Sequence, residues 1–396
     1  MCWRIQPGSV GVQPMTWPKT SVAFKPPDNG LRKRLSAKWR SILFMPAAKT
    51  LKTIDFFCGA GGMSYGFQQA GIQVLAGIDN AQDCKNTYLA NIKGAQYIER
   101  DINYLSVEEL KKIIKINDPN MIFIGCSPCQ FWSKIRTDKS KSIQTSNLLE
   151  QFQSFVKYFK PGFVIIENVP GLKKRNTESI LPSFVSFLSS AGYAWKDDII
   201  NTNHYGVPQQ RMRYLLIASR LHRNISLPKA DINKRLTVQD VIGQHNGFPL
   251  ISAGHRDLSP LLHTAASLSP QNIERIKRTP KSGGNRMAWA SDENLQIPTY
   301  KGRDSIFRDV YGRMAWDKPA PTITTRFNSL SNGRFGHPEE DRAISMREGA
   351  TLQTFPNSYI FYGSSQCSLA RQIGNAVPPE LARRIGLHIK AVHNNG

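Results

Sequence analysis

The 396-residue sequence lacks any apolar run that approaches the roughly 20 residues needed to cross a bilayer. Acidic residues are scarce, because 29 Asp and Glu stand against 52 Lys and Arg and leave a formal net charge of +23. No internal repeat or low-complexity tract is present, and the 40% hydrophobic content is ordinary for a globular protein. We therefore expect a cytoplasmic protein whose natural partner is a polyanion, with nucleic acid favoured over an anionic membrane surface.

Residue pairs suited to disulfides or metals are also missing. The six cysteines are scattered, and no signal peptide indicates an oxidising compartment, so free thiols are expected. Cys126 and Cys129 form a C-x-x-C pair, but the eight histidines supply no second pair at zinc spacing. The sequence therefore predicts no metal site.

The length exceeds one average domain of roughly 150 residues, so a large domain and a smaller one are expected. From Leu51 onward, short apolar runs alternate with segments of helical composition. This alternation predicts an α/β fold with a doubly wound, mostly parallel sheet. The expected divisions are a basic, disordered arm at 1–48, a catalytic cofactor-binding domain at 49–219, a smaller irregular domain at 220–340 and a segment at 341–396 that returns to the catalytic domain.

The expected secondary structure places the candidate motifs. The predicted strands are Lys52–Phe57, Val74–Ile78, Met121–Gly125, Phe163–Glu167 and Tyr214–Ala218. The predicted helices are Met63–Ala70, Val107–Lys115, Leu148–Phe159 and Thr177–Ser190. Ligands of doubly wound sheets bind outside the carboxyl ends of the strands, so the residues that follow each strand are the candidates for chemistry.

A glycine-rich loop, Asp55-Phe-Phe-Cys-Gly-Ala-Gly-Gly62, follows the first strand. Its glycines let a ligand approach the backbone, and the next helix offers free amides. Asp79 ends the second strand about 20 residues later, where an acidic residue binds ribose hydroxyls. A nucleotide-like cofactor fits this pattern, and so does an ordinary strand-to-helix turn. A dinucleotide would favour the full G-x-G-x-x-G spacing, which the loop lacks.

Other strand ends carry reactive side chains. The third strand leads into Cys126-Ser-Pro-Cys129-Gln, for which a nucleophile, a redox pair and a small buried residue are the alternatives, and the context favours the nucleophile. Glu167 ends the fourth strand, where it suits acid catalysis or a salt bridge. Alternation places Gln209, Arg211 and Arg213 on one face, and two arginines suit an anion or a carbonyl oxygen.

Taken in order, these segments resemble the motifs of the DNA (cytosine-5) methyltransferase family from Lys52 to the C-terminus. The glycine-rich loop resembles the S-adenosylmethionine (AdoMet) loop, Ser-Pro-Cys-Gln the nucleophile loop, Glu-Asn-Val the acid motif and Gln-Gln-Arg-Met-Arg the Q-x-R-x-R motif. Arg347–Pro356 resembles the helix that supports the recognition domain, and Gln372–Pro379 the final motif.

The resemblance implies roles for the matching residues. Cys129 is expected to be the nucleophile that adds to cytosine C6, Glu167 to hold the base at N3, and Arg211 and Arg213 to steady the intermediate. Phe57 is expected to stack on the adenine and Asp79 to bind the ribose, while Asp101, which equally suits a helix N-cap, flanks the adenine. The other expected members of the cofactor pocket are Gly59, Gly61, Gly62, Ile102, Pro128, Leu148 and Asn375.

The resemblance also implies a substrate. Double-stranded DNA with a flipped-out cytosine is expected, and the alternatives are a tRNA cytosine-5 methyltransferase and a catalytically inactive DNA-binding relative. The compact chain with one recognition domain suggests a restriction-modification system, with an endonuclease acting on the same site. A monomer on duplex DNA is expected. Basic residues expected to contact phosphates are Arg275, Lys277, Arg278, Lys281 and Arg286.

Overall fold

The computed structural model describes residues 50–127, 148–174, 180–233, 235–302 and 307–395. The chain divides into two units, Met1–Lys49 and Thr50–Gly396, and the description below concerns the second. The expected basic arm at 1–48, the nucleophile loop from Pro128 onward and Cys129 lie outside the described residues. Within the described part of the chain, no helix combines the length and apolar character that a membrane span requires.

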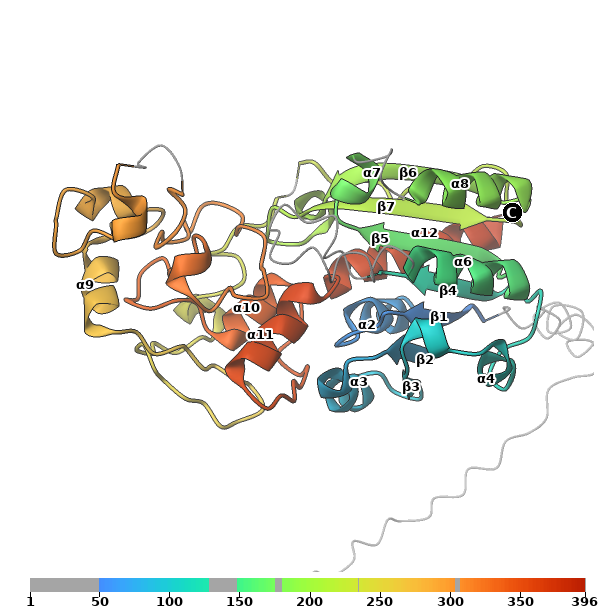
Figure 1. The fold of residues 1–396 in the computed structure, drawn as a ribbon, viewed down its shortest axis with the longest axis horizontal. Coiled ribbons are helices and arrows are strands. Elements are labelled where there is room, and N and C mark those ends of the chain that lie inside the picture. The colour runs from blue at the N-terminus through green and yellow to red at the C-terminus, as the bar shows by residue number, and fades with distance from the viewer. Residues whose placement is uncertain (1–49, 128–147, 175–179, 234, 303–306, 396) are drawn as a thin grey trace, which may run out of the picture. The chain divides into compact units, whose positions relative to one another are not determined.

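A 7-stranded sheet forms the body of the protein, in the order β3-β2-β1-β4-β5-β7-β6 (Figure 1). Neighbouring strands are parallel except at β7, which runs antiparallel to both β5 and β6. This arrangement confirms the predicted doubly wound, mostly parallel α/β fold. The strands are β1 Lys52–Phe56, β2 Gln73–Asp79, β3 Gln96–Glu99, β4 Met121–Gly125, β5 Phe163–Asn168, β6 Ala194–Asn201 and β7 Met212–Ser219.

Helices cover both faces of this sheet. Central strands alternate their side chains between two apolar clusters, so that Phe123 packs with α6 and α8 whereas Ile122 packs with α2 and α12. Burial on both faces explains why β4 and β5 read as continuous apolar runs. The helices are α2 Gly62–Gln69, α3 Lys85–Asn91, α4 Val107–Lys111, α6 Leu148–Phe159, α7 Gly171–Lys174, α8 Leu181–Ser190, α9 Pro270–Arg278, α10 Met346–Leu352, α11 Gln366–Asn375 and α12 Pro379–Asn395.

Two strands were not predicted, β3 and β6, and both lie at edges of the sheet. Their sequences, Gln-Tyr-Ile-Glu and Ala-Trp-Lys-Asp-Asp-Ile-Ile-Asn, remain largely half-buried or exposed, so they lack the apolar run that marks the central strands. The predicted helix at Val107–Lys115 ends earlier, at Lys111. Of the helix predicted at Thr177–Ser190, the described part is α8.

Between β7 and α10, the described residues form one α-helix, short 3-10 turns and isolated bridges, with no further strand. Buried arginines supply donors that a strand ladder would otherwise provide. Arg313 is 0% exposed and donates to the carbonyls of Thr279 (3.0 Å) and His337 (2.9 Å), among others. Arg347, also 0% exposed, donates to Tyr359 O at 2.9 Å. Because a guanidinium carries five donors, each such arginine satisfies several buried carbonyls.

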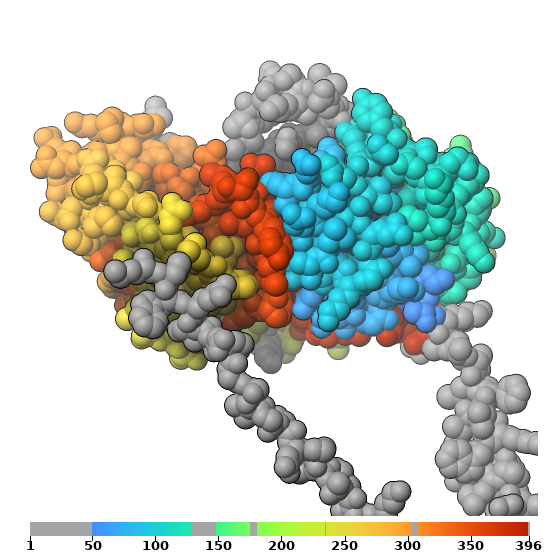
Figure 2. All heavy atoms as spheres, turned by 90° about the horizontal axis from the view of Figure 1, so that it is seen from below, coloured from blue at the N-terminus to red at the C-terminus, as the bar shows by residue number. Residues whose placement is uncertain are grey.

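The C-terminal segment packs against the start of the sheet domain. Figure 2 shows this segment (red) between residues of the irregular region (yellow and orange) and the N-terminal strands and helices (blue). Helix α12 lies against α2 so closely that a Cβ at Gly66 would stand 2.4 Å from the Cβ of Ala382. The segment also reaches the loop before α2, because the Tyr359 hydroxyl donates to Ala60 O.

Candidate active site

The glycine-rich loop between β1 and α2 depends on left-handed backbone conformations. Phe57, Gly59 and Gly61 have φ values of 66°, 48° and 88°. The amide of Phe57 donates to Ile78 O at 2.8 Å, which ties the loop to the end of β2. A Cβ at Gly59 would meet no atom within 4 Å, whereas one at Gly62 would stand 2.2 Å from the carbonyl oxygen of Val377. Gly59 therefore leaves open space for a ligand, and Gly62 allows the C-terminal segment to approach.

Asp79 lies at the carboxyl end of β2, beside this loop. Its Oδ2 accepts a hydrogen bond from Gly59 N (2.8 Å), and its Oδ1 accepts one from Ala81 N (2.9 Å). Burial raises the pKa of the Asp79 carboxyl above its ordinary value. Each carboxylate oxygen retains acceptor capacity beyond one hydrogen bond, so this fixed side chain suits the hydroxyls of a ribose.

Apolar residues from three separate segments meet near the loop. Ile102 and Leu148 are buried in one cluster, and Phe57 packs half-buried against it. All three residues were expected at the cofactor pocket from the family resemblance, and all three belong to or pack against this cluster. Asp101 accepts a hydrogen bond from Asn103 N (2.9 Å), so it does cap a short 3-10 helix. Asn375 is the exposed last residue of α11.

Behind the loop lies a buried acid that the sequence analysis did not single out. Asp55 is 0% exposed, and its Oδ2 accepts a hydrogen bond from Ser64 Oγ at 2.6 Å. Burial raises the pKa of Asp55 from 3.8 to about 7, although the Ser64 hydrogen bond opposes this shift. Ser64 Oγ also lies 3.0 Å from the Tyr88 hydroxyl, so a polar group of three side chains supports the first turn of α2.

Glu167 and Arg213 form a buried ion pair on the neighbouring strands β5 and β7. Their side chains are 8% and 13% exposed, and Arg213 Nε lies 3.1 Å from Glu167 Oε1. The contact is close in distance but not well directed as a hydrogen bond. Arg213 Nη1 donates to Met212 O at 2.7 Å, which fixes the guanidinium. A carboxylate and a guanidinium are thereby held together at the carboxyl end of β5.

Asn168, the residue after Glu167, connects this pair to the start of the nucleophile loop. It is 1% exposed, and its Nδ2 donates to Ser127 O (3.3 Å) and to Ser127 Oγ (3.2 Å). Ser127 is the last described residue before the loop that carries Cys129. The sequence thus places Cys129 two residues beyond an anchor to the acid motif.

Arg211 is positioned differently from Arg213, although the sequence assigned both to one face and one role. Arg211 is 3% exposed. Its Nη1 donates to Ile323 O (3.0 Å), and its Nη2 donates to Ala376 O (3.2 Å), while both nitrogens lie 3.3 Å from Gly374 O. Among the described residues, Glu167 pairs with Arg213, and Arg211 joins the Q-x-R-x-R segment to the C-terminal motif.

Two of the five basic residues expected at DNA phosphates are buried, which corrects that expectation. Arg275 is 7% exposed and donates from Nε to Leu295 O at 2.8 Å, and Arg286 is 0% exposed. The other three are exposed but paired with carboxylates: Lys277 with Glu274, Arg278 with Asp292 and Lys281 with Asp341. The sequence could not distinguish these cases, because arginines that bind backbone carbonyls in an irregular domain resemble solvated ones.

Only one group of His, Cys, Asp or Glu within the described residues is close enough to suggest a metal site, namely His337, Glu340 and Glu348. His337 Nδ1 accepts hydrogen bonds from the amides of Glu339 and Glu340, so the neutral ring carries its proton on Nε2. That nitrogen faces Glu340 and Glu348, which Arg342 already binds at 2.8 and 2.7 Å. This geometry favours a buried ion-pair network over a metal centre.

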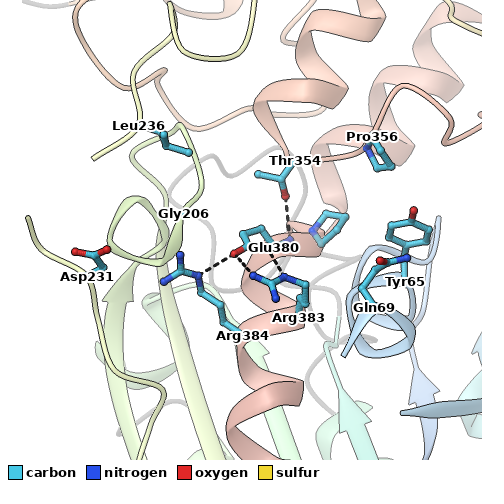
Figure 3. A pocket seen from close by; sticks show the side chains of 11 residues that line it. Tyr65, Gln69, Gly206, Asp231, Leu236, Thr354, Pro356, Glu380, Arg383 and Arg384 are labelled. Carbon is cyan, nitrogen blue, oxygen red and sulfur yellow. Dashed lines mark hydrogen bonds and ion pairs between the residues drawn. The ribbon is translucent and has the colours of Figure 1, made fainter. Parts of the chain in front are cut away.

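A pocket of about 480 Å³ lies at the start of α12 (Figure 3). Its lining includes Glu380, whose carboxylate accepts hydrogen bonds from Arg383 (2.7 and 2.9 Å) and Arg384 (2.9 Å). Tyr65 and Gln69 of α2 lie on another side (Figure 3). The pocket contains none of the predicted catalytic or cofactor residues, so the candidate active site is defined by the strand ends instead.

The sheet order, the glycine-rich loop with Asp79 at the next strand end, and the late segment that returns to this loop define an AdoMet-dependent methyltransferase fold. The family model for C-5 cytosine-specific DNA methylase matches residues 51–391. The chain belongs to this family, and it is a DNA (cytosine-5) methyltransferase. This membership supports DNA, and not tRNA, as the substrate.

Individual relatives agree with this assignment. Type II methylase M.HgiDII of Herpetosiphon aurantiacus is 38% identical over 85% of this chain and 94% of its own. Type II methyltransferase M1.HphI of Haemophilus parahaemolyticus is 31% identical over 87% of this chain and 88% of its own. The crystal structure of a DNA modification methyltransferase encoded within an E. coli prophage has a TM-score of 0.67 at 24% identity, covering 87% of this chain and 100% of that one.

Proposed function

We propose that the enzyme methylates cytosine through a covalent bond between Cys129 and C6 of a flipped-out base. The observation that carries this proposal is the buried pair of Glu167 and Arg213 at the end of β5, linked through Asn168 to Ser127, the first residue of the Ser-Pro-Cys-Gln segment. A base must leave the duplex to reach groups buried to this degree, at a cost of roughly a few kcal/mol.

The residue types match the chemistry. Cytosine C5 is a weak nucleophile, so the Cys129 thiolate adds to C6 and the displaced π electrons spread over C5, C4 and N3. Glu167 protonates N3 and accepts from the exocyclic amine, while Arg213 orients the carboxylate and faces O2. C5 then takes the methyl group of the AdoMet sulfonium. A base removes the C5 proton, and the electron pair restores the C5=C6 bond and expels the thiolate.

The cofactor pocket proposed here lies over the glycine-rich loop. Gly59 provides open space, Asp79 suits the ribose hydroxyls, and Phe57, Ile102 and Leu148 offer apolar surface to the adenine. Asp101, Pro128 and Asn375 complete the set implied by the family resemblance, and Gly61 and Gly62 shape the loop. AdoMet supplies the methyl group, and none of these residues needs a metal ion.

Target recognition is assigned to residues 220–340. Within this region we assign to Arg326 a contact with the DNA phosphate backbone. Arg326 is exposed and lies three residues after Ile323, whose carbonyl accepts a hydrogen bond from Arg211. The cognate DNA is double-stranded, and the enzyme acts as a monomer in the cytoplasm. The names of the Type II relatives support a restriction-modification role, which predicts a neighbouring endonuclease gene with the same recognition sequence.

A duplex containing 5-fluorocytosine tests the covalent step. Fluorine at C5 cannot leave as a proton does, so the enzyme should remain attached to the DNA after methyl transfer. We expect a denaturation-resistant complex with the wild-type enzyme and none with Cys129→Ala. A complex that forms equally well with Cys129→Ala would assign the nucleophile elsewhere. Cys367→Ala, which alters an exposed cysteine outside the proposed site, is the matched control.

A further inference from the structure

Three buried polar side chains form a junction, defined here as Gln209, Arg211 and Gln353. Their exposed fractions are 0%, 3% and 0%. Gln209 Nε2 donates to Gln353 Oε1 at 2.7 Å and to Leu352 O at 2.9 Å. Gln353 Nε2 donates in turn to Ile373 O (2.7 Å) and Ala376 O (3.3 Å). The junction therefore connects the Q-x-R-x-R segment, the end of α10 and the end of α11.

A fourth segment belongs to the proposed target-recognition region. Ile323 N donates to Gln209 Oε1 at 3.1 Å, and Ile323 O accepts from Arg211 Nη1 at 3.0 Å. The next residue, Thr324, packs so tightly on α11 that a Cβ at Gly374 would stand 2.4 Å from its backbone. Any shift of the junction must therefore move the backbone that leads to Arg326.

The same junction binds the segment that packs against the cofactor loop. Ala376, whose carbonyl accepts from both Gln353 and Arg211, precedes Val377. The Val377 carbonyl oxygen occupies the space where a Cβ of Gly62 would lie, at 2.2 Å. One set of buried hydrogen bonds thus holds both the segment that contacts the glycine-rich loop and the segment that leads to Arg326.

We propose that Gln353 is a positioning residue that couples AdoMet binding to DNA binding. Its amide is donor and acceptor at once, so it fixes the end of α11 through Nε2 and Gln209 through Oε1. A ligand that orders the segments on one side of the junction lowers the entropic cost of ordering that the other ligand must meet. Each ligand therefore raises the affinity for the other by the same factor. This inference rests on the proposed function only in that the enzyme must bind both ligands.

The test compares Gln353→Met with Gln372→Met. Gln372 is a matched control because it is also buried, at 3% exposed, and its Nε2 donates to Asp83 O (3.0 Å) and Tyr362 O (2.7 Å), on contacts outside the junction. Methionine preserves the side-chain length in both cases. The dissociation constant of S-adenosylhomocysteine is measured by calorimetry with and without saturating unmethylated plasmid DNA. The constant without DNA divided by the constant with DNA gives the coupling.

We expect the wild-type ratio to be about tenfold, within the usual range of roughly 5- to 150-fold. It should approach one in Gln353→Met and stay within twofold of wild type in Gln372→Met. An unchanged ratio in Gln353→Met, or an equal loss in both variants, would overturn the proposal. So would a wild-type ratio of one, whereas a wild-type protein that binds neither ligand would overturn the proposed function instead.

A milder variant decides the matter if Gln353→Met does not fold. Thr322 Oγ1, from a half-buried side chain, donates to the carbonyl of Gln210 at 2.7 Å, and Gln210 lies between the junction residues Gln209 and Arg211. Thr322→Val keeps the shape of the side chain and removes this hydrogen bond. We expect a ratio reduced at least twofold, and a ratio equal to wild type would count against the proposal.

Discussion

Replacing Arg211 by leucine should lower the free energy of unfolding of the enzyme. It should not remove a group that contacts the reacting base. The substitution deletes donors to three buried carbonyls, those of Ile323, Gly374 and Ala376. Ala376 O keeps its hydrogen bond from Gln353, so two buried acceptors are left without a donor, and at about 1–3 kcal/mol each we estimate a loss of about 2–6 kcal/mol. This is a large share of the roughly 5–15 kcal/mol that stabilises a typical protein.

Urea unfolding followed by circular dichroism measures this loss, and the matched variant is Arg213→Lys. A lysine keeps a positive charge beside Glu167 but loses the planar guanidinium, so it should retain most of the stability while kcat falls on the order of a hundredfold. For Arg211→Leu we expect the reverse, namely reduced stability with kcat per folded molecule within about tenfold of wild type. The division of roles would be refuted if the free energy of unfolding of Arg211→Leu lay within about 1 kcal/mol of the wild-type value while kcat fell and KM stayed unchanged.

Three further predictions concern the loop and the DNA surface. Because the pKa of Asp55 in the folded protein is raised to about 7, its favourable contribution to stability is present at low pH and is lost as the pH rises from about 4 through 7. The free energy of unfolding of Asp55→Asn should therefore increase relative to that of wild type between pH 5.5 and 8, as measured by urea unfolding. A difference between the two proteins that does not change with pH would disprove this. Gly62→Ala should raise the KM for AdoMet at least tenfold, because its Cβ meets Val377 O at 2.2 Å, and an unchanged KM would show that the C-terminal segment is free to move. Arg326→Ala should weaken DNA binding and reduce the salt slope by about one, whereas Lys277→Ala, already paired with Glu274, should not; equal effects would remove Arg326 from the interface.

The sequence predicted the parts of the fold that are encoded locally. Residues Met121–Gly125 and Phe163–Glu167 are buried on both faces of the sheet, so their apolar runs stand out. The residues that follow such strands must meet at one edge, and Phe57 follows the first predicted strand. Ile102 and Leu148, in contrast, were expected at the cofactor pocket only because of the family resemblance. The edge strands β3 and β6 were not predicted, because their solvent-facing positions do not require apolar residues.

The partners of buried polar side chains could not be predicted. Arg211 binds carbonyls that lie 112 to 165 residues further along the chain, and a backbone carbonyl has no sequence signature. Gln353 stands inside a motif quoted from the sequence, yet nothing there identifies Gln209 as its partner. The burial of Arg275 and Arg286 is likewise a tertiary property, because a basic residue in a polar segment is usually solvated.

The most direct test of the central claim is to incubate the enzyme with tritiated AdoMet and either unmethylated plasmid DNA or tRNA, beside the Cys129→Ser variant, and to locate the product by bisulfite sequencing. We predict label at cytosines of one short sequence in the DNA, no label in tRNA, and no label from Cys129→Ser. Label confined to tRNA would contradict the DNA substrate, and label that persists in Cys129→Ser would contradict the mechanism.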